Sequence, residues 1–116
     1  MLKSILAGLL LSFALVLPAQ ANHDLNGVCM SIAMSMVNIA TDVVSGSTEK
    51  ETTQWYLDYL ASQGKVPGDF EKRILHVIKV VHAIQPLTGE TLEPVIEKEY
   101  NLCMSIHGDY SRLQVF

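Results

Sequence analysis

The sequence predicts an all-α fold, a small four-helix bundle with one long-range disulfide, preceded by a cleaved signal peptide. Three observations lead to this prediction: apolar residues recur at three- and four-residue steps, turn and capping residues separate these segments, and an export signal precedes them. We expect residues 1–21 to be the signal peptide and residues 22–116 to form a single helical domain, because a chain of this length is too short for two domains.

The first segment has the pattern of a secretory signal. Lys3 gives a positive start, residues 5–17 are an apolar run, and Ala19-Gln20-Ala21 is a small-residue cleavage site. The apolar run is shorter than the roughly 20 residues that a membrane-spanning helix needs. We therefore expect cleavage after Ala21, a periplasmic or secreted location, and no stable membrane anchor in the mature protein.

The segment from Leu25 to Val44 is expected to be the central helix. It has no charged residue between Asp24 and Asp42. On a helical wheel, two apolar rows lie side by side and the serines share a narrow polar stripe with Asn38 and Asp42. A helix that is apolar over most of its circumference needs neighbours on at least two sides. If the chain leaves the second apolar row uncovered, a homodimer would cover it.

The second helix is expected from about Glu49 to Gln63, because Thr48 and Glu51 fit a capping box. It carries the candidate partner surface: Trp55, Tyr56 and Tyr59. Trp55 and Tyr59 are one turn apart and share a helix face. Two interpretations are open, namely bulky core residues, with the tyrosine hydroxyl groups reaching water, or an aromatic surface that binds a partner.

Gly64 is a natural end for this helix, and Asp69 can cap a third helix from Phe70 to about Ile84. Pro86 follows, and a proline cannot continue the helical hydrogen bonds.

The last helix is expected to begin near Thr91, with Pro94 in its first turn, where proline is favoured. Gly108 is expected to close it. Residues 109–116 show no pattern that assigns them to an element.

Cys29 and Cys103 are expected to form a disulfide. Two cysteines in an exported chain indicate a bridge. Their spacing differs from that of a thiol redox pair, in which the cysteines lie within one helical turn. We therefore interpret the bridge as structural, joining the first helix to the last.

Charge and motifs exclude several function classes. The chain has 8 Lys and Arg against 12 Asp and Glu, and cleavage would remove Lys3. An acidic chain without a basic cluster is not expected to bind nucleic acid or anionic lipid. Acidity fits a basic protein partner, and it is also an ordinary means of staying soluble. The sequence has no catalytic motif, phosphate loop or zinc motif, so we expect no enzyme activity, no metal site and no cofactor.

Four residues give a candidate ligand set: Met30 and Met34 in the first helix, and Met104 and His107 in the last. If these helices are antiparallel neighbours, all four lie at one end of the bundle. Thioether and imidazole groups can bind copper or haem iron, although methionine in an apolar stripe is ordinarily core filler. Periplasmic four-helix b-type cytochromes place Met on the first helix and His on the last, and the chain resembles them in size, export and these two positions. This resemblance implies a haem or copper carrier.

In outline, the chain also resembles small bacterial envelope proteins, with an export signal, one small helical domain and a long-range disulfide. Among these are periplasmic acid-stress chaperones and the immunity proteins that neutralise toxins delivered to the periplasm. This resemblance implies a protein-binding module such as an inhibitor, immunity protein or envelope chaperone, with another envelope or secreted protein as partner. The alternative is a periplasmic carrier of a small ligand, haem or copper.

Overall fold

The computed structural model describes residues 24–113, which form four α-helices and one short 3-10 helix, with no strand among them. These elements are α2 (Asp24–Val44), α3 (Glu49–Ser62), α4 (Asp69–His82), α5 (Gly89–Ser105) and η2 (Tyr110–Arg112). The predicted all-α class with four helices is confirmed for this part of the chain. The expected signal peptide, residues 1–21, lies outside the described residues, as do residues 22–23 and 114–116.

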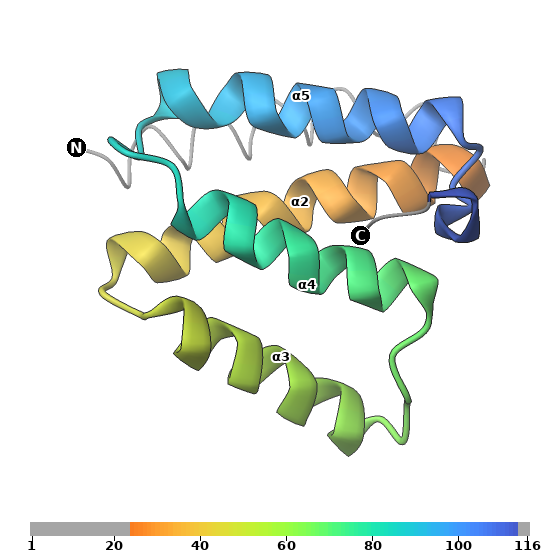
Figure 1. The fold of residues 1–116 in the computed structure, drawn as a ribbon, viewed down its shortest axis with the longest axis horizontal. Helices are drawn as coiled ribbons and strands as arrows, with labels where there is room; N and C mark the ends of the chain where they lie inside the picture. The colour runs from red at the N-terminus through yellow and green to blue at the C-terminus, as the bar shows by residue number, and fades with distance from the viewer. Residues whose placement is uncertain (1–23, 114–116) are drawn as a thin grey trace.

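α2 is the central helix of the bundle (Figure 1). α5 runs antiparallel beside it, and α4 packs on it from another side. The core consists mainly of apolar residues of α2, α4 and α5, and Cys29, Ile32 and Met36 of α2 are fully buried. Ser31 and Asn38 of the predicted polar stripe are exposed. The prediction that α2 needs neighbours on at least two sides is confirmed.

The second apolar row of α2 consists of Met30, Ala33, Met34, Val37 and Val44. It is also largely covered, because three of these residues are buried and the other two are half-buried. Leu25–Val44 is long and apolar enough to cross a membrane, as core helices of soluble proteins can be. Within this fold, its apolar rows pack against neighbouring helices.

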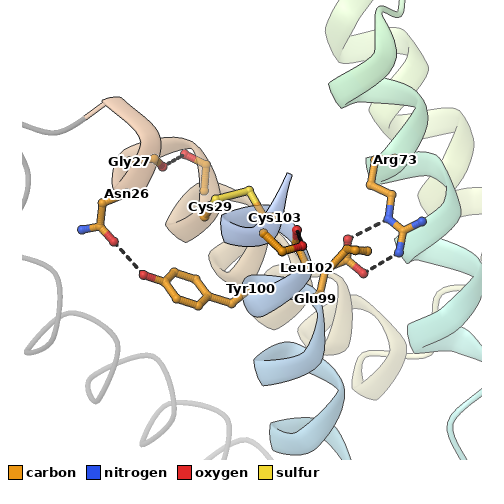
Figure 2. The surroundings of a disulfide bond; sticks show 10 residues. Asn26, Gly27, Cys29, Arg73, Glu99, Tyr100, Leu102 and Cys103 are labelled. Carbon is orange, nitrogen blue, oxygen red and sulfur yellow. Dashed lines mark hydrogen bonds and ion pairs between the residues drawn. A yellow bond between two sulfur atoms is a disulfide. The ribbon is translucent and has the colours of Figure 1, made fainter. Parts of the chain in front are cut away.

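The predicted disulfide joins α2 to α5 (Figure 2). The Sγ atoms of Cys29 and Cys103 are 2.10 Å apart, and both cysteines are 0% exposed. Close by, the Tyr100 hydroxyl donates a hydrogen bond to Asn26 Oδ1 at 2.7 Å. The first turns of α2 are therefore fixed to the last turns of α5 by a covalent bond and a hydrogen bond.

A buried ion pair joins α4 to α5 (Figure 2). Arg73 donates from Nε to Glu99 Oε2 and from Nη2 to Glu99 Oε1, both at 2.7 Å. The hydrogen bond to Glu99 raises the pKa of Arg73, although burial acts in the opposite direction. Removing one partner of such a pair would leave a buried charge without compensation. The pair therefore constrains how α4 and α5 pack.

The starts of α3 and α4 differ in how they are capped. At α3 the predicted capping box is confirmed, because Glu51 N donates to Thr48 Oγ1 at 3.1 Å and Thr48 N donates to Glu51 Oε1 at 2.8 Å. At α4 the cap is Gly68, whose backbone N–H donates to Glu71 Oε1 at 2.9 Å. Asp69 is thus the first residue of α4, and the prediction that it is the cap was wrong.

α5 begins at Gly89, two residues before the predicted start at Thr91. Thr88 is the cap: its Oγ1 accepts from Thr91 N at 3.1 Å, and its own N–H donates to Thr91 Oγ1 at 2.8 Å. Pro94 consequently lies inside the helix rather than in its first turn. This cap was not predicted because Thr91 replaces the Glu or Gln of the usual capping box.

The end of α5 also differs from the prediction. His107 was expected within the last helix, but α5 ends at Ser105 and His107 has φ 55°. Gly108 N donates to Cys103 O at 2.8 Å, and His107 N donates to Met104 O at 3.1 Å, which is the hydrogen-bond pattern of a Schellman motif. A Cβ atom at Gly108 would be 3.3 Å from Leu25 Cδ1, so the chain passes close to the start of α2 here.

The unassigned tail contributes a core residue. Tyr110 of η2 is almost completely buried, and its ring meets that of Phe70 edge-on, with 6.0 Å between centroids. Burial raises the pKa of the Tyr110 hydroxyl, and the nearby Glu99 carboxylate raises it further. This hydroxyl has no hydrogen-bond partner among residues 24–113. η2 therefore packs onto the α4 side of the core.

We predict that Cys103→Ser lowers the free energy of unfolding by about 2 to 5 kcal/mol, because the bridge spans a sequence separation of 74 residues and restricts the unfolded chain. Urea unfolding without reductant measures this difference. Ser105→Ala is the control, since this exposed hydroxyl bonds only to Leu102 O in its own helix. An unchanged unfolding midpoint for Cys103→Ser would contradict a stabilising bridge.

Candidate functional site

α3 is the least buried helix of the bundle. Thr52 and Leu60 are its only buried residues, and it packs mainly on α4. One polar contact to α4 is the hydrogen bond between Thr52 Oγ1 and His82 Nε2, at 2.9 Å. In Figure 1, α3 leaves the end of α2 through a short turn and then runs along the outer side of α4. α3 therefore leaves part of the α2 surface uncovered.

A groove of about 840 Å³ opens between α2 and α3, with two isoleucines of α4 also lining it. The described residues that line it are Ser35, Asn38, Ile39, Thr41 and Asp42 of α2, Ser47 of the turn, Glu51, Thr52, Trp55, Tyr56 and Tyr59 of α3, and Ile74 and Ile78 of α4. The α3 residues recur at steps of four and thus occupy one face of that helix. The volume lies within the range of about 300 to 1,000 Å³ that is common for ligand sites.

The aromatic side of the groove contains the candidate partner surface. Trp55 is 64% exposed and Tyr59 is 49% exposed. Their rings are stacked, with centroids 5.9 Å apart and planes inclined by 10°. These two side chains are therefore not core residues, although the sequence left that interpretation open. Tyr56 lines the same groove, so all three candidate residues lie together.

Tyr56 is half-buried and packs against the core. Burial raises the pKa of its hydroxyl to about 12, with smaller contributions from the negative charge of Glu71 and from Tyr59. The hydroxyl therefore stays protonated at neutral pH and can donate a hydrogen bond in the groove.

The charged groups that line the groove are Asp42 and Glu51, and no Lys, Arg or His is among its described lining residues. The backbone N–H of Thr48 lowers the pKa of Glu51, and the Thr48 side chain lowers it further. Among residues 24–113, the Asp42 side chain forms no hydrogen bond or ion pair. The groove thus combines aromatic surface with negative charge.

The second candidate set lies elsewhere, at the end of the bundle where α2 begins and α5 ends. Met30 is buried, Met34 and Met104 are half-buried, and His107 is exposed beyond the end of α5. Among residues 24–113, no cluster of three or more His, Cys, Asp or Glu side chains is placed to hold a metal ion. Binding of haem or copper by these four residues stays the alternative to the expectation of no cofactor.

Asp42 and Glu51 were not predicted as site residues. The polar stripe of α2 was visible in the sequence, and so was the role of Glu51 in the capping box. The sequence pattern did not show that the stripe faces the aromatic side of α3, because that pairing depends on how the helices pack.

Comparison of the chain with protein-family models, with curated proteins and with solved structures finds no match. The function is therefore inferred from the groove and its residues.

We predict that Tyr56 makes stability depend on pH in the alkaline range. The phenol titrates near pH 10 in an unfolded chain and at about 12 in the folded protein. Its contribution to stability is complete below pH 10 and is lost as pH rises toward 12, because the unfolded state ionises first. Denaturant unfolding at about pH 9 and about pH 11 measures this loss, which should be smaller in Tyr56→Phe than in the wild type. An equal loss in both proteins would contradict the raised pKa of Tyr56.

Proposed function

We propose that this chain is a small exported binding protein, acting in the periplasm or outside the cell, that recognises another protein through the α2–α3 groove. The observation that carries this proposal is the stacked, exposed pair of Trp55 and Tyr59 beside an acidic groove. Tryptophan and tyrosine are enriched among the residues that contribute most to protein–protein binding, because their large rings lose water on contact.

The exposure of the rings favours a protein partner over a small ligand. Small-ligand sites usually enclose about 70 to 90% of the ligand surface. Here Trp55 and Tyr59 keep about half or more of their surface in solvent, so the groove is open on the aromatic side. A partner surface that extends beyond the groove can cover both rings. A small-ligand carrier is the second candidate function, and the groove volume of about 840 Å³ is what favours it.

Two features support an exported location. The chain begins with the pattern of a secretory signal and an Ala-x-Ala site. The disulfide between Cys29 and Cys103 is compatible with an oxidising compartment such as the periplasm. An envelope or secreted protein is accordingly the expected class of partner.

Affinity capture from cell-envelope extract tests the proposal. We predict that the tagged wild-type protein retains one partner in near-stoichiometric amount, and that Trp55→Ala retains it at least about tenfold less, since loss of a central aromatic contact commonly weakens binding by this factor or more. Quantitative mass spectrometry of the captured material gives the ratio.

Val66→Ala is the matched control for this experiment. Val66 is 88% exposed, lies in the α3–α4 connection and does not line the groove. Both substitutions remove exposed apolar surface, so neither should change stability by more than about 0.5 kcal/mol. Equal capture by the wild type and Trp55→Ala would contradict recognition through the groove.

A further inference from the structure

Resting on the proposed function, we infer that the α2–α3 groove recognises an arginine side chain of the partner protein, with the guanidinium against the Trp55–Tyr59 pair and paired with Asp42. This inference names the chemistry of the partner segment, which the proposed function leaves open. It follows from the charge of the groove, from its exposed rings and from the placement of the chain's own cations.

The negative charge of the groove favours binding of a positively charged group. Asp42 and Glu51 line it, and none of its described lining residues is basic. Glu51 already accepts the Thr48 backbone N–H, whereas the carboxylate of Asp42 has no hydrogen-bond or ion-pair partner among residues 24–113. Asp42 also lies in the last turn of α2, where the helix dipole disfavours a negative charge. A cation bound beside Asp42 would relieve this unfavourable position.

The exposed aromatic rings favour binding of a cation that is planar and weakly hydrated. A cation over the face of Trp or Tyr is attracted by the π electrons, and Trp gives the strongest attraction. The rings of Trp55 and Tyr59 are stacked on each other, and each side chain keeps about half or more of its surface in solvent. Guanidinium is planar, stacks on such surfaces and can pair with a carboxylate through two hydrogen bonds, whereas the ammonium of Lys is compact and strongly hydrated.

The chain's own arginines do not occupy the groove. It has two, Arg73 and Arg112. Arg73 is buried and paired with Glu99, and Arg112 belongs to η2, which packs against α4 and contributes no lining residue. The guanidinium must therefore come from another molecule, and under the proposed function that molecule is the partner protein.

Fluorescence anisotropy with a labelled peptide tests the inference on the full mature protein. The probe is Gly-Leu-Arg-Gly-Arg-Leu-Gly, and the matched probes replace both arginines by citrulline, which is neutral, or by lysine. We expect the arginine peptide to bind about tenfold more tightly than the citrulline peptide and several-fold more tightly than the lysine peptide. Binding should also weaken as the salt concentration rises.

Two substitutions locate the binding. Asp42→Asn should weaken binding of the arginine peptide about tenfold, and Trp55→Ala about three- to tenfold. Asp58→Asn is the control, because it also removes one negative charge, but from α3. Asp58 is exposed, accepts a hydrogen bond from Gln54 and does not line the groove. It should change the affinity less than twofold. Circular dichroism checks that each variant is folded.

Three results would overturn the inference: no binding of the arginine peptide, equal binding of the citrulline or lysine peptide, or equal weakening by Asp42→Asn and Asp58→Asn. None of these affects the proposed function, which is tested separately by whether capture of the partner depends on Trp55. If capture of the partner depends on Trp55 but the arginine peptide is not recognised, the groove remains the proposed binding site and the inferred recognition of a guanidinium is rejected.

Discussion

The structure depends on the burial of α2. This helix is apolar over most of its circumference, and its burial requires helices on more than one side. α5 covers one side and is fixed there by the buried Cys29–Cys103 bridge. α4 covers another, and the ion pair of Arg73 and Glu99 ties it to α5. The disulfide and the ion pair thus join α2, α4 and α5 to one another. The polar stripe of α2 is not covered by α4 or α5.

The position of α3 follows from that polar stripe. Asp42 and Asn38 would lose water if α3 packed closely onto them, and burial of a charged or polar group without a partner is unfavourable. α3 instead packs mainly on α4, where it buries Leu60 and Thr52. The groove is the space that remains between the polar side of α2 and the aromatic side of α3. The same polarity that keeps the two helices apart gives the groove its charge.

Local patterns in the sequence predicted the central helix, the bridge and the capping box of α3, because each depends on residues close together in the chain or on a single pair of cysteines. The cap at Thr88 was missed, since Thr91 is not the usual capping-box partner. The core role of Tyr110 and the burial of Arg73 with Glu99 were missed because they depend on tertiary packing.

For the candidate site, the sequence identified Trp55, Tyr56 and Tyr59. It did not identify Asp42, whose place opposite them is set by how α2 and α3 diverge.

The central claim is that partners bind at the α2–α3 groove. Photo-crosslinking in living cells tests it most directly, with benzoylphenylalanine placed at Tyr59 beside the groove or at Glu97, an exposed position on α5 that does not line it. We expect one dominant crosslinked species from position 59 and none from position 97. Crosslinks from position 97 alone, or from neither position, would contradict it.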